Sequence, residues 1–485
     1  MSNYSVPEAI RKLKPKGTMV KALPGGYYVY EYSKFRGDDG KQHTKMGKII
    51  GSIKEGIGFV PNNNYNCDFN RTVFEFGDYA ILMANSKKTL ALLKECFNPL
   101  DAVMIYTVSI IHLIQQFSCV KAIQDYFDMS FLSIKYPTLK VGYDSISNLY
   151  VTLGSKRQGV LALEEKLIAS CSNEIAIDGH VIGSKSQNND MSEKGYKFSK
   201  ISEPQVNLLM AYDVNTKIPL ISSFFSGSSP DKVSVKEVLD EVELRNALFV
   251  IDRGFYSEEN LKLFTQNDNN YIIPLARNLT SYKQAVNSID KLPFSFLYDE
   301  GDKNNCIEYK DEIINGNRVL VFRDLTETAR EKANYRRHIK KKDRGYTEAN
   351  FQKFAPFLGV MVLQTSLHDK EPEEIYRLYK KRWSIEIFYK FLDNDIDFNG
   401  LYQQDYYAAQ GLAFIMQVCG LIYREFEVAV KDVNEEVEDC LRFARKIKAQ
   451  KMQQRWLLTN CEKKHLKLFK KLNAPLDVTA YLQGF

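Results

Sequence analysis

Two aspartates stand in similar places in the sequence, each at the end of a short apolar run. Asp178 follows three apolar residues in the stretch EIAIDGHVIGS, and Asp252 follows the run LFVI in ALFVIDRGF. Either residue alone is explained by a strand that ends where a polar loop begins. If the two strands are neighbours in one sheet, their carboxylates lie side by side, which is costly unless a cation neutralises them. Because Mg²⁺ prefers carboxylate oxygens as ligands, the pair predicts a divalent-metal site.

A third carboxylate, Glu386, lies in the stretch EPEEIYRLYKKRWSIEIFYKFLDND, which has the apolar spacing of a helix and a proline, Pro372, near its start. Polar residues recur on this helix at intervals of three and four: Tyr379, Arg382, Glu386 and Lys390. That spacing puts them on one face of the helix. The apolar residues on the other side of the helix can orient this polar face toward a sheet. The simpler alternative is an exposed Glu386 that pairs with Lys390, an interaction worth roughly 0.2–0.5 kcal/mol.

The elements that position these residues follow from the hydrophobic pattern, which is helical from about residue 87 to residue 172 and mixes strands with helices after it. This predicts an α/β core preceded by a helical domain. The expected segments are a basic N-terminal β-hairpin module at 1–85, a helical DNA-binding domain at 86–172, a first core part at 173–280, a β-rich insertion at 281–366, a second core part with the glutamate helix at 367–430, and a basic helical tail at 431–485.

One stretch of the predicted insertion, AREKANYRRHIKKKDRG, is dense in basic residues. It contains Arg336, Arg337, Lys340 and Lys341. Such a run usually forms a solvated face, and the alternative is contact with phosphate groups. The charge of the whole chain does not decide between these two, because a net charge of +6 over 485 residues permits nucleic-acid binding without requiring it.

The composition narrows the class of protein further. Hydrophobic residues make up 44% of the chain, so a large folded core is expected. The eight cysteines form no Cys-x-x-Cys pair, which argues against a structural zinc site. The longest apolar stretch, residues 411–423, is too short to span a bilayer, and the first residues contain no apolar segment. We therefore expect a cytoplasmic protein without a membrane partner.

Several longer motifs occur in one order: GGYYVYEY, AIDGHVIGSKS, KGYKFSK, IPLISSFFSGSSPDK, FVIDRGFYSEENL, YIIPLARN, GVMVLQTS and YKKRWSIEIFYKFLDND. With them the chain resembles, over nearly its whole length, the DDE transposases of bacterial insertion sequences, in the branch with a Tyr-x2-Arg-x3-Glu-x6-Lys signature. The resemblance implies a ribonuclease-H-like core in which a β-rich insertion separates the second aspartate from the glutamate. The interval between Asp252 and Glu386, 386 − 252 = 134 residues, leaves room for that insertion.

The resemblance also implies the residues and the cofactor of the reaction. Asp178, Asp252 and Glu386 are the implied catalytic residues and the ligands of two Mg²⁺ ions, for which Mn²⁺ substitutes. The implied DNA contacts, together with the basic run, are Tyr379, Arg382, Lys390, Arg336, Arg337, Lys340 and Lys341. The implied partners are double-stranded DNA, both transposon ends and target, and a second copy of the chain on that DNA.

The chain departs from the signature at its last position, because residue 393 is Asp393 and not lysine. Lys390 lies on the same helical face and can take over its role. Alternatively, the chain is a catalytically decayed, transposase-derived DNA-binding protein, or a metal-dependent nuclease that does not join strands. We expect a transposase that cleaves DNA at the ends of its element and joins them to a target on nucleoid DNA, because all three carboxylates are present.

Overall fold

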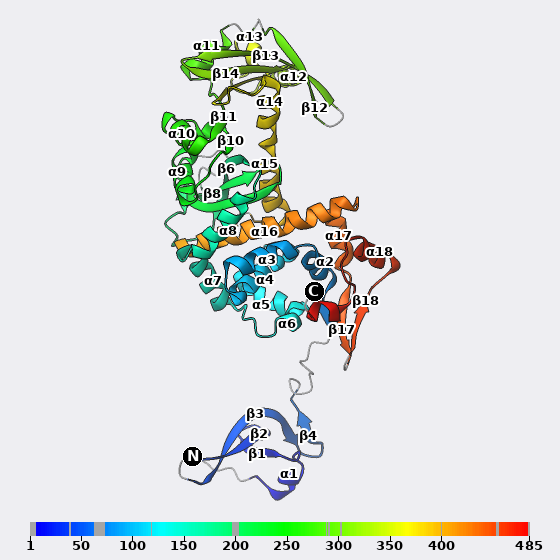
Figure 1. The fold of residues 1–485 in the computed structure, drawn as a ribbon. Coiled ribbons are helices and arrows are strands. Elements are labelled where there is room, and N and C mark those ends of the chain that lie inside the picture. Colours follow the sequence, from blue (N-terminus) through cyan, green and yellow to red (C-terminus); the bar gives the residue numbers. More distant parts are fainter. Residues whose placement is uncertain are drawn as a thin grey trace. The chain divides into compact units, whose positions relative to one another are not determined.

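The computed structural model describes residues 6–37, 40–62, 73–117, 119–195, 203–287, 289, 292–300, 303–398, 400–452 and 455–483. Contacts within the chain divide it into two compact units, residues 1–73 and 74–485, which are both drawn in Figure 1.

The first unit is a small antiparallel sheet with one short helix. Its elements are α1 (Glu8–Lys12), β1 (Thr18–Leu23), β2 (Gly26–Arg36), β3 (Gln42–Lys54) and β4 (Gly58–Pro61), and the strands pair in chain order. Four apolar side chains form its core: Ile10, Val29, Ile50 and Ile53. Strands β2 and β3 extend past their other neighbours, so their distal halves pair only with each other.

The second unit begins with a group of helices that pack around one long helix from near the end of the chain. These are α2 (Gly77–Ala84), α3 (Lys87–Cys96), α4 (Pro99–Gln115), α5 (Val120–Met129), α6 (Leu132–Lys135), α7 (Tyr143–Ser155) and α8 (Gln158–Ala169), and the long helix is α16 (Tyr406–Asp432). Figure 1 shows α16 between these helices and the sheet.

Helices α7 and α16 cross closely because each carries a glycine at the crossing. A Cβ atom at Gly154 would collide with the backbone carbonyl oxygen of Tyr407, and one at Gly411 would collide with that of Tyr150.

Within the described residues, no single helix has the length and hydrophobicity needed to cross a membrane. Helices α4 and α5 together have that length and hydrophobicity, but they are separated by a 90° bend.

A large mixed sheet forms the rest of the second unit. Its strands are β6 (Glu174–Ser184), β7 (Glu193–Lys194), β8 (Pro204–Asp213), β9 (Ile218–Ser226), β10 (Leu248–Ile251), β11 (Asn270–Pro274), β12 (Phe294–Glu300), β13 (Lys303–Ile314), β14 (Asn317–Asp324), β15 (Val360–Thr365) and β16 (Gly400–Leu401). The connecting helices are α9 (Asp231–Glu241), α10 (Glu258–Leu263), α11 (Thr280–Val286), α12 (Leu325–Lys341) and α13 (Glu348–Phe354).

The first strand of this sheet in chain order, β6, lies in the middle of a group of five strands. Strands β9, β8, β6, β10 and β11 lie side by side; the β9–β8 and β8–β6 pairs are antiparallel, and the β6–β10 and β10–β11 pairs are parallel. Strand β11 then pairs with β15, and β14, β13 and β12 continue the same sheet in antiparallel order. The strands predicted for the insertion therefore extend the sheet of the core.

Helix α16 covers the edge strand β9 and satisfies part of its backbone. The Gln410 amide accepts a hydrogen bond from the Phe224 N–H (3.0 Å) and donates one to the Phe224 carbonyl (2.7 Å). Gln417 donates to the Leu220 carbonyl (2.6 Å) and accepts from the Ser222 hydroxyl (3.0 Å). These buried amides take the place of a further strand, because buried backbone groups without partners are costly.

The prediction of a helical tail is only partly right. Between α17 (Val437–Ala444) and α18 (Lys463–Lys471), strands β17 (Lys448–Met452) and β18 (Arg455–Thr459) form an antiparallel hairpin, and α19 (Val478–Leu482) follows. The hairpin joins β5 (Val73–Glu75) in a small sheet, where Trp456 packs edge-on against Phe74 at 5.9 Å between ring centres. Pairing with such a distant segment is a tertiary contact that overrides local helical spacing.

Replacing Gln410 by leucine tests the covering of β9. The substitution Gln410→Leu leaves the N–H and C=O of Phe224 buried without partners, at about 1–3 kcal/mol each. We expect a lower melting temperature for the full chain, by about 2–4 °C for each kcal/mol lost. The control is Gln352→Leu, because Gln352 is exposed on α13. Equal melting temperatures for the two variants would contradict this role of Gln410.

Candidate active site

The sheet brings the two aspartates together. Strands β6 and β10 are parallel neighbours, and Ile177 pairs with Ile251 in their register. Asp178 and Asp252 come directly after these two residues, so they occupy equivalent positions on adjacent strands. Only Asp252 lies at a strand end, because β6 continues past Asp178 to Ser184 in its pairing with β8. Asp252 continues the extended backbone for one residue beyond β10, before the turn at Arg253. The chain thus places both carboxylates at one point of the sheet.

Arg382 links the sheet to the glutamate helix. Its guanidinium lies 2.7 Å from a carboxylate oxygen of Glu386 and 3.7 Å from one of Asp178, and its side chain is only 13% exposed. Burial is the largest single influence and lowers the pKa of the Arg382 guanidinium. Tyr379 and the three carboxylates, Asp252 included, outweigh burial and raise that pKa above its ordinary value. The three predicted metal ligands therefore converge on one permanently charged guanidinium.

Tyr379 lies beside the same guanidinium. Arg382 is 5.8 Å from the centre of the Tyr379 ring. Burial is the main cause that raises the pKa of the Tyr379 hydroxyl to about 12, against the opposing charge of Arg382. The hydroxyl therefore keeps its proton at neutral pH and can donate a hydrogen bond.

Glu386 pairs with Arg382 and not with Lys390. The simpler alternative, an exposed Glu386 paired with Lys390, is therefore wrong.

The helix that carries these residues is interrupted, whereas the sequence predicts a continuous one. It consists of α14 (Pro372–Lys381), a tight turn at Arg382, α15 (Trp383–Lys390) and a π-helical turn over Phe391–Asp395. The Arg382 N–H bonds to the carbonyl of Tyr379, three residues back, at 3.1 Å. Departures of this kind from regular α-helix often occur at functional sites.

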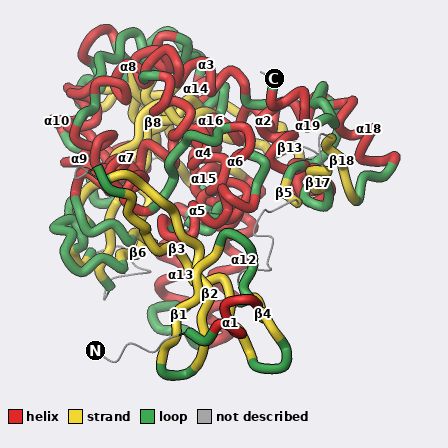
Figure 2. The backbone as a smooth tube through the Cα atoms, turned by 90° about the horizontal axis from the view of Figure 1, so that it is seen from below, coloured by secondary structure: helices red, strands yellow, loops and turns green. Residues whose placement is uncertain are grey.

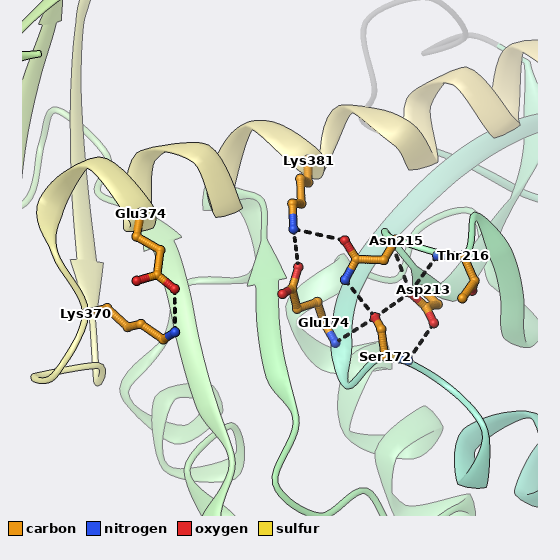
Figure 3. Close-up of polar contacts among 8 residues, drawn as sticks. All are labelled: Ser172, Glu174, Asp213, Asn215, Thr216, Lys370, Glu374 and Lys381. Atoms are coloured by element: carbon orange, nitrogen blue, oxygen red, sulfur yellow. Dashed lines mark hydrogen bonds and ion pairs between the residues drawn. The ribbon is translucent and has the colours of Figure 1, made fainter. Parts of the chain in front are cut away.

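Polar contacts hold α14 against the start of β6 (Figure 3). Lys381 donates to Glu174 at 2.8 Å and to the Asn215 side chain at 2.9 Å. Behind them, the Asp213 carboxylate accepts hydrogen bonds from Ser172 (2.8 and 2.7 Å) and from the Thr216 N–H (3.1 Å). Burial raises the pKa of the Asp213 carboxyl, but these hydrogen bonds lower it more, so it lies below its ordinary value. Asp213 therefore stays ionised and keeps this anchor intact.

Asp393, which stands where the signature has lysine, is hydrogen-bonded to His180 at 2.9 Å. The His180 ring stacks on Tyr389 with 4.6 Å between ring centres, and the Tyr389 hydroxyl donates to the backbone carbonyl of Asp178 at 2.7 Å. Asp393 is thus connected to the first aspartate through two aromatic side chains. His180 lies two residues after Asp178 on β6, which places both side chains on the same face of the sheet.

The remaining predicted DNA contacts lie elsewhere. The Lys390 ammonium lies 5.2 Å from the centre of the exposed Trp383 ring. Helix α12 carries the exposed residues Arg336, Arg337, Lys340 and Lys341. The first turns of α12 and the helices α14 and α15 together line a cleft of about 760 Å³. Basic and aromatic side chains along it include Arg277, Arg330, Lys380, Lys381 and Trp383.

The residues of the cluster fit a divalent cation by their chemistry. Within the described residues, no three His, Cys, Asp or Glu side chains are already arranged around a common metal position. The three carboxylates are nevertheless the oxygen ligands that Mg²⁺ prefers. One guanidinium cannot neutralise three carboxylates, so the cluster keeps a negative charge that attracts a cation. One Glu386 oxygen accepts a hydrogen bond from Arg382, and a carboxylate that binds a metal can also accept a hydrogen bond.

A family model matches the part of the chain that contains this cluster. Residues 169–401 match the family model of the transposase DDE domain, a segment that contains Asp178, Asp252 and Glu386. The chain matches no curated protein. Among solved structures, it is similar to a chain in a cryo-EM structure of the piggyBac transposase synaptic complex with hairpin DNA, with a TM-score of 0.40 and 11% identity over 83% of this chain and 81% of that one.

Removing the guanidinium should make the protein depend on metal for its stability. In Arg382→Gln the carboxylates of Asp178 and Glu386 lose their counter-charge, so we expect a lower melting temperature in EDTA than for wild type, by about 2–4 °C per kcal/mol. Added Mg²⁺ should raise the melting temperature more in this variant than in wild type, because it supplies the missing charge. Differential scanning fluorimetry measures both. Arg245→Gln, at an exposed arginine, is the control, and an equal response to Mg²⁺ in both variants would contradict the shared site.

The contact between Asp393 and His180 predicts that lysine is unfavourable at this position. Asp393→Lys removes the hydrogen-bond acceptor, at a cost of about 1 kcal/mol. Asp393→Asn keeps an acceptor oxygen and should lose less. Thermal unfolding of both variants beside His180→Ala measures the effect. If Asp393→Lys is as stable as wild type, the contact contributes nothing to holding β6 against the π-helical turn.

Proposed function

We propose that the chain is a DDE transposase that binds the ends of its insertion sequence, cleaves phosphodiester bonds and joins the ends to target DNA by two-metal catalysis. One observation carries this proposal: Asp178, Asp252 and Glu386 converge on one guanidinium within the segment that matches a transposase DDE domain. We further propose a dimer on DNA and a cytoplasmic location on nucleoid DNA.

The topology of the sheet supports the ribonuclease-H-like part of the proposal. An antiparallel trio of strands, β9, β8 and β6, is followed by the parallel strands β10 and β11. Strands β12 to β15 lie between Asp252 and Glu386 in the chain, where the family resemblance places a β-rich insertion. We infer a ribonuclease-H-like core whose sheet is lengthened by its own insertion.

In the proposed mechanism, Asp178, Asp252 and Glu386 would hold the metals, and bound Mg²⁺ would activate the attacking oxygen and offset the charge on the leaving oxygen. Arg382 first keeps the three carboxylates together. Once they are neutralised, its guanidinium is available to a DNA phosphate, which it can bind through two parallel hydrogen bonds. Tyr379, which stays protonated, can donate to the same backbone. Lys390 and the basic residues of α12 would bind DNA farther along.

The test is cleavage of DNA that carries the sequences flanking the gene. Asp178→Ala, Asp252→Ala and Glu386→Ala should each lower the cleavage rate by about 10²-fold or more in Mg²⁺ or Mn²⁺, because the metals supply several kcal/mol. DNA binding, measured by fluorescence anisotropy, should persist in all three. Glu374→Ala is the control, since Glu374 lies on α14 but pairs with Lys370. Near-wild-type cleavage by any of the three variants would refute the assignment.

Two other functions give different results in the same assay. A nuclease without strand transfer would cut the ends but leave no joined products with target DNA. A decayed transposase would bind without cutting, and Asp393→Lys would restore cleavage. The contact of Asp393 with His180 favours the active enzyme, because through His180 and Tyr389 it connects Asp393 to the backbone of Asp178.

A further inference from the structure

The positive charge of the chain is concentrated near its C-terminal end. Residues 442–471, named here the C-terminal basic module, contain eleven lysines and arginines against one acidic residue, Glu462, which is a net charge of +10. The whole chain carries +6, so all other residues together carry 6 − 10 = −4. A local excess of this size marks a surface for a polyanion more strongly than the charge of the whole chain does.

The module is a folded part of the second unit. It runs from the end of α17 through the β17–β18 hairpin to α18. Figure 1 shows β17, β18 and α18 beside α17, and in both Figures 1 and 2 these three elements lie apart from β6 and α15. The module therefore presents its charge at a surface other than the carboxylate cluster.

Helix α18 divides its residues between two faces. Lys463, Lys467 and Lys470 follow one another at intervals of four and three residues, so they form one exposed stripe. The opposite face buries Leu468 and Phe469, which are 8% and 1% exposed. The lysines are therefore held on a fixed helix and not on a mobile tail.

Some cations of the module are used within the fold and others are not. Ion pairs with acidic neighbours are made by Arg442, Arg445, Lys448, Lys464 and Lys471. Within the described part of the chain, no ion pair involves the exposed cations Lys446, Lys451, Arg455, Lys463, Lys467 and Lys470. Lys451 lies 6.0 Å from the centre of the Trp456 ring, which adds an aromatic side chain to the basic surface.

We propose that the C-terminal basic module binds the phosphate backbone of double-stranded DNA, as a second contact surface outside the carboxylate cluster. The proposal rests on DNA as the substrate proposed above and goes beyond it by assigning the surface that supplies affinity. Lysine and arginine that neutralise phosphates release condensed counterions, which makes such binding independent of sequence and steeply dependent on salt. The module thus holds DNA, and the cluster cuts it.

A membrane surface is the other polyanion to consider, and the structure favours DNA. A helix that lies in a membrane interface buries its apolar face among the lipids. In α18 that face already packs inside the protein, and Leu466, 54% exposed, is the large apolar residue on the lysine stripe. The stripe therefore offers charge with little apolar surface, which matches a phosphate backbone.

The test compares two triple variants of the full chain. The module variant combines Lys463→Gln, Lys467→Gln and Lys470→Gln. The control variant combines Lys94→Gln, Lys121→Gln and Lys236→Gln, which are exposed lysines on other helices. Anisotropy of a labelled duplex without element ends is measured over a range of NaCl. Three lost phosphate contacts should reduce the slope of log Kd against log salt by about 2–3 and weaken binding by about tenfold or more.

The proposal is supported if the module variant shows this loss, the control variant binds like wild type, and replacing the same three lysines by arginine preserves binding. Wild-type affinity and slope in the glutamine variant would overturn it. It would also be overturned if the variant lost binding to phosphatidylserine vesicles but not to DNA. Cleavage of element ends by wild type is measured separately. If DNA binding depends on the C-terminal basic module but no cleavage occurs, only the proposed function is refuted. If cleavage occurs but DNA binding does not depend on the module, only this proposal is refuted.

Discussion

Three carboxylates gathered near one guanidinium are the constraint around which the second unit is built. Asp178, Asp252 and Glu386 would repel one another if they met alone. The buried guanidinium of Arg382 offsets part of that repulsion, and it does so from the same helix pair as the glutamate, only four residues away. The cluster can therefore fold without a cation and still attract one.

Everything that fixes the position of Arg382 then matters for the cluster. The anchor of Lys381 on Glu174 ties α14 to the beginning of β6, and the chain from Asp393 through His180 and Tyr389 ties the end of the glutamate helix to Asp178. The interrupted helix is thus attached to the strand that carries the first aspartate both at its middle, through Lys381, and at its end, through Asp393. Arg382 lies directly after the first of these attachments.

The sheet itself depends on contacts from far along the chain. Strand β9 ends one side of the central strands, and the buried amides of Gln410 and Gln417 cover its backbone from α16. On the other side, the insertion strands continue from β11 through β15. The insertion therefore widens the sheet and also positions α12, whose first turns share a cleft with α14 and α15. The positive charge collected in residues 442–471 belongs to elements that lie apart from β6 and α15.

The sequence by itself determined the parts of the protein that local spacing encodes. Apolar runs that end in Asp178 and Asp252 identified two strands of one sheet, and three-and-four spacing identified the face that holds Tyr379, Arg382 and Glu386. Tertiary structure alone decided which partners these residues have. Glu386 pairs with Arg382 and not with Lys390: Arg382 is held in part by Asp178 on β6, and the Lys390 ammonium lies over the Trp383 ring. Lys448–Met452 and Arg455–Thr459 pair as strands and do not form a helix, because β5 offers them a sheet and Phe74 offers Trp456 an aromatic surface 456 − 74 = 382 residues away. Asp393 contacts His180 across more than two hundred residues of sequence (393 − 180 = 213), a distance over which no periodicity carries information.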